Sequence, residues 1–256
     1  MNYYTAVKII QAFCFIGGPL VILFNFNGLY LFLAWLYSYI VVHMGISVFM
    51  HRGFAHRSWE PKNKLIAVIG HYLSVINLVN STLSWVGTHR WHHKHSDTEL
   101  DPHRIKDMSL WHRIKCWHNV FPHHRVPTRV IRDLLKDPLH RWFHKYYFYI
   151  IAAHAGVMLL IDIDLFLYGF IVSSMFMLHT TSWITVGAHI WGTPSDNTKD
   201  DSKNTWLMGL YMWGEGWHNN HHAKPNSYKM GWNKNQPDFG QYVIKLLAKP
   251  ESLKYD

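Results

Sequence analysis

Histidine is the residue through which this sequence is best equipped to do chemistry. The chain of 256 residues has 21 histidines against 16 acidic residues, and only two cysteines, Cys14 and Cys116. Two thiols cannot build a four-thiolate zinc or iron–sulfur site, so any metal site must use imidazole nitrogen. Neutral imidazole binds several first-row transition metals. The histidines are therefore the candidates for a metal centre.

Eight of the histidines form three short motifs. The first places His51 and His56 five residues apart, about 140° on an ideal α-helix, so they share a site only if the helix ends or bends between them. Otherwise they face different metals. The other two motifs repeat the spacing i, i+3, i+4, which places three imidazoles on one helix face. They consist of His89, His92 and His93, and of His218, His221 and His222. Eight imidazoles are twice what one tetrahedral ion binds, so they predict two metals.

Long apolar segments must position these motifs. Four runs approach the roughly 20 residues that cross a bilayer as a helix, and they lie at about 9–24, 29–50, 146–163 and 165–188. No Lys or Arg follows Lys8 until Arg52, and none follows Lys145 until Lys199. Because the turn within each pair lacks cations, the positive-inside rule predicts two hairpins with both termini on the cytoplasmic side. A soluble protein with four buried core helices is the alternative, which segments of this length disfavour.

We therefore predict one all-α integral membrane domain over residues 1–256. Its four transmembrane helices form two hairpins, and a cytoplasmic helical cap at about 52–145 and 190–256 holds the di-metal site. Residues 65–86 are apolar but interrupted by polar side chains, which predicts an amphipathic helix on the membrane face. The net charge of +9 then marks the cytoplasmic face, and nucleic acid is not an expected partner.

The phrases around the motifs resemble one protein family. HRGFAHRSW, THRWHHKHSDTELDPH and GEGWHNNHH, in this order, are similar to the histidine boxes of membrane fatty-acyl desaturases of the stearoyl-CoA and acyl-lipid Δ9 type. The likeness covers about residues 50–230. It implies a four-span enzyme that uses dioxygen, two electrons and a non-haem di-iron centre to introduce a cis double bond into an acyl chain. Spacing alone would equally suit copper or zinc.

The resemblance also implies a ninth ligand and a supporting set of polar residues. The family has a histidine followed by a glycine near the end of the last span, and His189 in VGAHIWGTP matches it. Thr185 occupies the place where the family often has an asparagine, and is a candidate neighbour of the metals. Since carboxylates and polar groups orient ligating imidazoles, Asp101, His103 and Glu215 are predicted to support the histidines. Capping a helix is the alternative role for Glu215.

An acyl substrate requires an apolar tunnel. Trp35 and Tyr39 lie i, i+4 on one face of the second predicted span, three to four turns before His51. We predict that they close the tunnel and limit acyl length. Aromatic side chains that face lipid or the membrane interface are the alternative.

The partners follow from what the chain lacks. Acyl-CoA members of the family often have an arginine where this chain has Gly87, which favours acyl-lipid or acyl-carrier-protein substrates over acyl-CoA. No HPGG haem motif, GxGxxG fingerprint or four-cysteine set occurs, so a separate ferredoxin or cytochrome b5-type donor is expected. The cations that could bind such a donor, a CoA phosphate or anionic membrane lipids include Arg104, Lys106, Arg113, Lys115, Arg125, Arg129 and Arg132.

Two other functions fit parts of the pattern. A di-iron membrane hydroxylase or alkane monooxygenase uses similar boxes, and a metal transporter could use clustered histidines without being an enzyme. Transport sites lie near the bilayer midplane, whereas these motifs begin where the predicted spans end. Carboxylate-bridged di-iron proteins are excluded, because the chain has four glutamates and only one ExxH motif.

Overall fold

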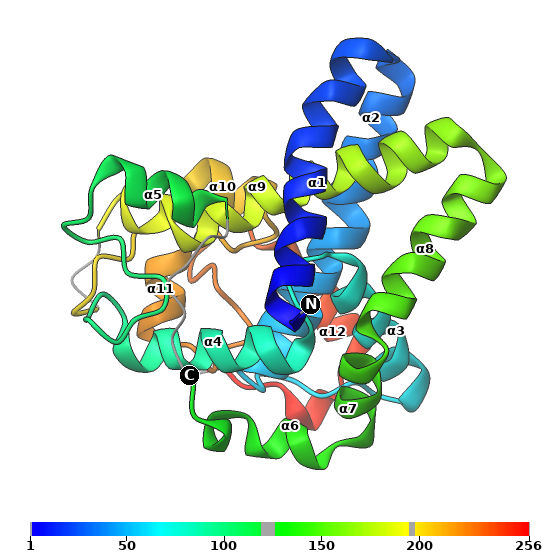
Figure 1. Ribbon diagram of the computed structural model, residues 1–256. Helices are drawn as coiled ribbons and strands as arrows, with labels where there is room; N and C mark the ends of the chain where they lie inside the picture. The colour runs from blue at the N-terminus through cyan, green and yellow to red at the C-terminus, as the bar shows by residue number, and fades with distance from the viewer. Residues whose placement is uncertain (1, 119–125, 195–197, 256) are drawn as a thin grey trace.

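The computed structural model of the chain describes residues 2–118, 126–194 and 198–255. Every regular element within these ranges is a helix, and none of the described residues forms a named strand. The predicted all-α class is therefore confirmed. Helices α1 (Tyr3–Phe24) and α2 (Gly28–Tyr37) project together from a broader body of shorter helices (Figure 1).

The first predicted hairpin consists of two helices that are long and apolar enough to cross a membrane. The first is α1, whose 22 residues begin after the N-cap Asn2. The second, Gly28–Ala55, continues from α2 through two π-helical stretches, η1 (Ser38–Val42) and η2 (Met44–Ala55). Between them the Asn27 side chain accepts hydrogen bonds from the backbone of Leu29 and Tyr30 and caps α2. The predicted break at 25–28 is thus a capped turn.

The second predicted hairpin contains one further helix of membrane length. Leu165–His189 runs through the π-helix η4 (Leu165–Val172), α9 (Ser173–Thr185) and the short turn η5 (Gly187–His189). Its partner α8 (Tyr147–Ile161) has 15 residues, which extend about 22 Å against the roughly 30 Å of a hydrocarbon core. Three of the four predicted spans thus have membrane length, and a crossing at 146–163 stays a prediction. The two turns meet where Asn25 donates to Asp164 Oδ1 at 2.7 Å.

The prediction of a single helix at 65–86 is wrong. The structure has two helices, α3 (Lys64–Ile76) and α4 (Thr82–His95), with Leu78 between them in the left-handed region at φ 59°. Gln11 of α1 stabilises this break because its side chain donates to the carbonyls of Leu78 at 2.8 Å and Val79 at 3.2 Å. The Ser81 side chain then caps α4. A buried polar residue of the first predicted span therefore sets where the helix with the second histidine motif begins.

Short helices complete the body. They are α5 (Leu110–Trp117), η3 (Thr128–Ile131), α6 (Arg132–Lys136), α7 (Pro138–Lys145), α10 (Trp206–Tyr211), α11 (His218–Ala223), α12 (Phe239–Leu247) and η6 (Pro250–Ser252). Several expose large apolar side chains, among them Trp111 on α5, Trp206 on α10 and Tyr242 on α12. Exposed aromatic residues on short amphipathic helices are typical of a membrane interface.

Arg52 ties the end of η2 to the chain around the third histidine motif. Its side chain is fully buried, and Nη1 donates to Asp238 Oδ1 at 2.9 Å and to the carbonyl of Tyr228 at 3.1 Å. Its Nη2 donates to the carbonyl of Trp213 at 2.5 Å. A buried guanidinium is costly without partners, so these bonds hold residues 213–238 against η2. At Gly214, where φ is 101°, a Cβ would lie 2.8 Å from Arg52.

We predict that Gly45→Ala destabilises the protein. A Cβ at this position would lie 2.4 Å from the carbonyl oxygen of Leu73 in α3, so η2 and α3 would have to separate. Overpacking of this kind costs about 1–3 kcal/mol. In Gly156→Ala on α8 the added Cβ meets nothing within 4 Å, so stability should be unchanged or slightly higher. Thermal unfolding of both variants in detergent, followed by tryptophan fluorescence, checks this; equal midpoints would contradict it.

Candidate metal centre

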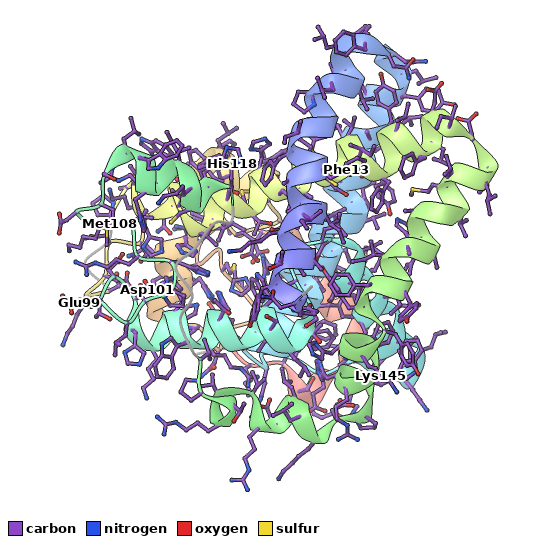
Figure 2. All side chains as sticks on the ribbon, in the orientation of Figure 1. Phe13, Glu99, Asp101, Met108, His118 and Lys145 are labelled. Atoms are coloured by element: carbon purple, nitrogen blue, oxygen red, sulfur yellow. The ribbon has the colours of Figure 1, made fainter. Side chains whose placement is uncertain are left out.

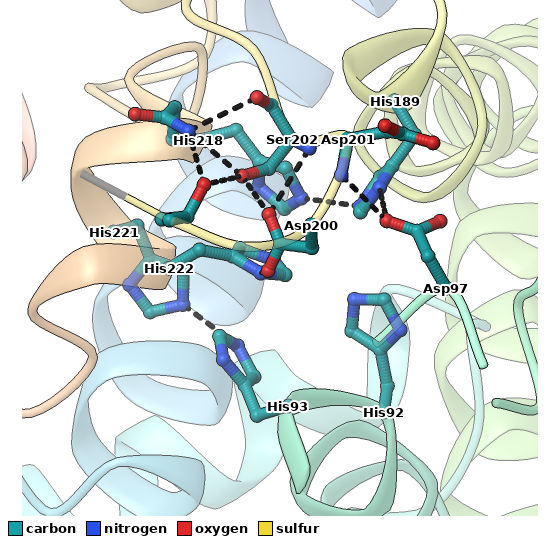
Figure 3. Close-up of polar contacts among 12 residues, drawn as sticks. His92, His93, Asp97, His189, Asp200, Asp201, Ser202, His218, His221 and His222 are labelled. Atoms are coloured by element: carbon teal, nitrogen blue, oxygen red, sulfur yellow. Dashed lines mark hydrogen bonds and ion pairs between the residues drawn. The ribbon is translucent and has the colours of Figure 1, made fainter. Parts of the chain in front are cut away.

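The nine histidines predicted as ligands gather in two buried groups. The five-histidine group consists of His51, His56, His89, His93 and His221. The four-histidine group consists of His92, His189, His218 and His222. In each group one ring nitrogen per histidine lies within 4.8 Å of all the others. Figure 3 shows the rings from α4, α11 and the end of the last long helix converging on one region.

A π-helical turn brings the first motif together. The backbone N–H of His56 donates to the carbonyl of His51, five residues earlier, at 3.1 Å. A π-helix has i to i+5 hydrogen bonds, so it turns less per residue than an α-helix and rotates these side chains toward one face. Their ring centroids are 4.9 Å apart, and both belong to the five-histidine group. The pair therefore shares one candidate site.

Each of the other two motifs divides between the groups. On α4, His89 and His93 belong to the five-histidine group and His92 to the other; on α11, His218 and His222 belong to the four-histidine group. The reason is helix geometry, since i+4 lies about 40° to one side of residue i and i+3 about 60° to the other. His221 accordingly joins the five-histidine group. Both helices therefore reach both groups.

The ring nitrogens within each group are too close to be explained by hydrogen bonding alone. His89 Nε2 lies 2.8 Å from His56 Nε2 and 3.1 Å from His93 Nε2, and His221 Nε2 lies 3.0 Å from both His51 Nε2 and His93 Nε2. A neutral imidazole carries one N–H, so five mutually adjacent Nε2 atoms cannot all be paired. Two nitrogens bound about 2.1 Å from one ion at right angles would be about 3.0 Å apart. The donor set thus fits a metal ion.

Carboxylates hold the far side of four rings. In each case a ring Nδ1 donates to an Asp or Glu oxygen, which leaves the lone pair on Nε2, directed into the group. The pairs are His51 with Glu215 at 2.6 Å, His92 with Asp101 at 2.8 Å, His222 with Asp200 at 2.7 Å and His189 with Asp97 at 3.3 Å.

Glu215 and Asp101 contact the histidines that they were expected to support. Glu215 Oε1 also accepts from the Ser47 hydroxyl at 2.5 Å, and Arg52 Nε lies 3.5 Å away. No side chain caps the start of α11, so Glu215 does not cap this helix. Asp101 lies on the loop beyond α4, on the inner side of Glu99 (Figure 2), and accepts from the backbone of His103 at 2.8 Å.

Burial sets the protonation of the site. Desolvation, together with the charge of neighbouring rings, lowers the pKa of His89, His93, His218 and His221 well below the usual value. Burial also lowers the pKa of His222 to about 4, although Asp200 acts to raise it. Burial acts to raise the pKa of Asp200, but its bond to His222 outweighs this and holds the pKa below the usual range. Neutral rings beside ionised carboxylates are the protonation state that binds a cation.

A cavity of about 20 Å³ lies beside both groups. It is enough for one small molecule, since a water requires about 10–15 Å³ by this measure. Its lining includes histidines of both groups and the apolar side chains of Ile46, Trp85 and Ile184. Thr185 and His103 also line the cavity, and their supporting role stays a prediction.

The two residues predicted to close the tunnel do not line this cavity. Trp35 and Tyr39 stack with centroids 5.6 Å apart, and Tyr39 is 5.9 Å from Tyr211. Neither is among the described residues that line the 20 Å³ cavity. Their role in limiting acyl length stays a prediction. Of the cations expected to bind partners, Arg125 lies outside the described residues.

The sequence is also similar to that of known proteins. A family model described as fatty acid desaturase matches residues 9–237. This chain belongs to the fatty acid desaturase family. Among curated relatives, an sn-1 stearoyl-lipid 9-desaturase of Anabaena variabilis is 30% identical over 225 residues, which are 87% of this chain and 82% of that protein. A Delta-9 desaturase-like 4 protein of Arabidopsis thaliana is 34% identical over 212 residues, which are 79% and 68% of the two chains.

Sequence reasoning missed two carboxylates of this family member. Asp97 lies within the same phrase as Asp101, and its side chain accepts from the backbone of Asp201 at 2.8 Å as well as contacting His189. Asp200 lies in the polar segment after the last long helix, where Ser202 donates to it. A histidine motif followed by an aspartate four to eight residues later was a usable signal for Asp97. Nothing in the sequence singled out Asp200 from its neighbour Asp201.

We expect Asp200→Asn to weaken metal binding by about 10–100-fold, the usual effect of losing a partner that orients a ligand. The amide cannot hold the His222 Nδ1–H as a carboxylate does. Asp201→Asn is the matched control, because that carboxylate binds Lys106 at 3.0 Å on the surface. Titration with ferrous iron, followed by dialysis and elemental analysis, measures both. Equal retention of metal by the two variants would argue against the role of Asp200.

Proposed function

We propose that this member of the desaturase family is an oxygen-dependent membrane fatty-acyl desaturase with a histidine-ligated di-iron centre. The observation that carries the proposal is the division of nine imidazoles into groups of five and four, each with carboxylate-oriented rings. Two groups provide for two ions, and the donor set suits iron, copper or zinc. The choice of iron rests on the family to which the chain belongs.

The chain's own residues would bind the metal ions and orient the ligating imidazole rings. Glu215 and Asp200 keep the Nδ1 protons of His51 and His222 in place, so that the opposite lone pairs face the ions. When bound, the irons would supply the chemistry that no side chain here offers, namely activation of dioxygen to remove hydrogen from an unactivated methylene. Ile46 and Ile184 offer an apolar surface against which an acyl methylene could be positioned near both groups.

The proposed product is a cis Δ9 monounsaturated chain carried on a lipid. Two curated relatives support this by name, the sn-1 stearoyl-lipid 9-desaturase of Anabaena variabilis and Delta-9 acyl-lipid desaturase 2 of Arabidopsis thaliana. Gly87 supports it as well, because a Cβ at this position would meet the apolar side chains of Ile131 at 3.4 Å and Val126 at 3.7 Å. A site built for the phosphates of acyl-CoA would place a cation there. Acyl-CoA and acyl-carrier protein remain the alternatives that product analysis separates.

The proposed placement is that of a multi-pass membrane protein with both termini and the metal centre on the cytoplasmic side. His51 lies near the end of Gly28–Ala55, and His189 ends Leu165–His189. Both candidate ligands therefore lie at one end of an apolar helix. A transporter would hold its ion near the middle of such helices, so this position favours the enzyme. A soluble ferredoxin or cytochrome b5-type protein would supply the electrons.

Expression in a host that lacks its own desaturases, with fatty acids profiled by mass spectrometry, tests the function. We expect a new monounsaturated acid that is abolished in His92→Ala and His221→Ala, one from each group. His95→Ala is the control, because His95 lies on the same helix as His92, packs on Trp91 and belongs to neither group. A hydroxylated acid instead of an olefin would favour the hydroxylase. A product that persists in both ligand variants would contradict the proposed ligands.

We propose that Trp35 and Tyr39 limit the length of the acyl chain, since their stacked rings form a bulky block on the long helix that leads to His51. Trp35→Ala and Tyr39→Ala should move the preference to chains about two or more carbons longer, because removing a ring opens space along the helix. Leu33→Ala, an exposed neighbour on α2, should leave the preference unchanged. The ratio of product chain lengths in the same host measures this, and an unaltered ratio in both aromatic variants would exclude the role.

A further inference from the structure

A surface depression of about 410 Å³ lies between the segment 229–237 and the start of α12. This volume is within the roughly 300–1,000 Å³ of small-ligand pockets. None of the nine candidate metal ligands is among the described residues that line the depression. Its charged lining residues are Lys229, Lys234 and Asp238. The depression is therefore large enough for a ligand and separate from the metal centre.

The depression is positive because its one described acid is already neutralised. Asp238 Oδ1 accepts from Arg52 Nη1 at 2.9 Å, in an ion pair whose two side chains have no exposed surface. Lys229 and Lys234, by contrast, take part in none of the ion pairs that the described residues form. Lys229 Nζ lies 4.9 Å from the centre of the Tyr255 ring, which holds the side chain but leaves its charge uncompensated. Two unpaired ammonium groups thus line the depression.

Hydrogen bonds fix the segment that carries these lysines. The backbone of Met230 donates to the same buried aspartate at 2.8 Å, and that of Trp232 donates to Gln236 Oε1 at 2.7 Å, which closes the turn around Lys234. At Gly231 a Cβ would lie 2.2 Å from the carbonyl oxygen of Gln236, so the two sides of the turn are in close contact. A ligand therefore meets a site that is already formed, which lowers the entropy cost of binding.

An exposed apolar face of α12 borders the depression. Phe239, Tyr242 and Leu246 lie at i, i+3 and i+7 on one side of this helix and are between 43% and 69% exposed. The exposed Trp206 of α10 donates from Nε1 to the carbonyl of Asn235 at 2.9 Å, so it adds an aromatic ring at the edge of the same turn. Aromatic and aliphatic side chains exposed beside lysines are typical of a surface that lies in the membrane interface.

The depression lies at the level where the long helices end. Gly240 of α12 packs on Arg52, since a Cβ at this glycine would lie 2.8 Å from the guanidinium, and Arg52 is near the end of Gly28–Ala55. Figure 1 shows α12 at the height of the start of α1, away from the turn between α1 and α2. The polar head groups of a bilayer flank its hydrocarbon core. A membrane that contains these helices therefore brings lipid phosphates to this level.

We propose that this depression binds the head group of an anionic phospholipid from the surrounding bilayer. The phosphodiester lies between Lys229 and Lys234, and the acyl chains lie along the apolar face of α12. Two unpaired ammonium groups favour a lipid of net negative charge over a zwitterionic one. The inference goes beyond the proposed function and does not depend on it, because it requires only that the long helices lie in a membrane.

A lipid at this site is coupled to α11. Asn220, within the third histidine motif, donates from Nδ2 to the carbonyl of Met230 at 3.0 Å and to Gln236 Oε1 at 3.1 Å. Both partners belong to the segment that carries the lysines. Because a ligand that binds only the folded chain stabilises it, the lipid raises the stability of the structure around the metal centre.

Native mass spectrometry of the protein in detergent, which counts bound lipids, tests the proposal. The probes are dioleoyl phosphatidylglycerol and dioleoyl phosphatidylcholine. We expect the double variant Lys229→Gln, Lys234→Gln to bind phosphatidylglycerol about 25-fold more weakly, about fivefold for each lysine, with little change for phosphatidylcholine. The control Lys136→Gln changes an exposed lysine of α6 that does not line the depression, and should stay within about twofold of the original protein.

Further arms separate the outcomes. The double variant Lys229→Arg, Lys234→Arg keeps both charges and should retain the preference for phosphatidylglycerol, which should also raise the thermal midpoint of this variant. Tyr242→Ala should weaken binding of both lipids alike, because it removes an apolar contact and no charge. Equal affinity of the original protein for the two lipids, unchanged affinity in the Gln variant, or an equal loss in Lys136→Gln would overturn the proposal. So would displacement of the lipid by millimolar inorganic phosphate, which would assign the site to a free anion.

Discussion

The structure depends on nine imidazole rings whose Nε2 atoms face one another in the interior. Burial keeps these rings neutral, and carboxylates fix the protons of four of them on the outer nitrogen, so lone pairs converge. Such an arrangement is repulsive unless a cation lies between the rings, and it is lost if any ring rotates. The fold around the groups therefore serves mainly to prevent rotation. The Arg52 network and the carboxylates are parts of one framework, in which Glu215 contacts both His51 and Arg52.

Helix geometry divides the rings between two centres with few elements. A motif with spacing i, i+3, i+4 on a straight helix presents its rings about 100° apart in two directions, so α4 and α11 each supply both groups. The π-helical end of η2 achieves the opposite result, because its wider turn brings His51 and His56 to the same group. Two helices that diverge and one that converges yield five rings on one side and three on the other, where His189 supplies the fourth.

Sequence reasoning predicted the all-α class, four spans of which three have membrane length, and the nine histidines that gather. Local spacing and apolar length carry that information. It missed the break at 77–81 because Gln11, far away in the chain, satisfies the carbonyls that the break exposes. It missed Asp200 because only the fold distinguishes it from Asp201, one turned toward His222 and the other toward Lys106 on the surface. It could not choose between one site and two for His51 and His56, since that depends on π-helical winding.

Each histidine group has an inner and an outer side, and this separates the reactants. His51 and His89 of the five-histidine group line the small cavity together with Ile46 and Trp85, whereas His56 and His93 line a surface depression of about 380 Å³. The proposed irons would therefore have apolar side chains on one side and an open depression on the other. Water at the inner side would weaken the electrostatic hold on the ions and offer a competing reactant. A centre where the long helices end can keep water from its inner side and still be reached from the surface.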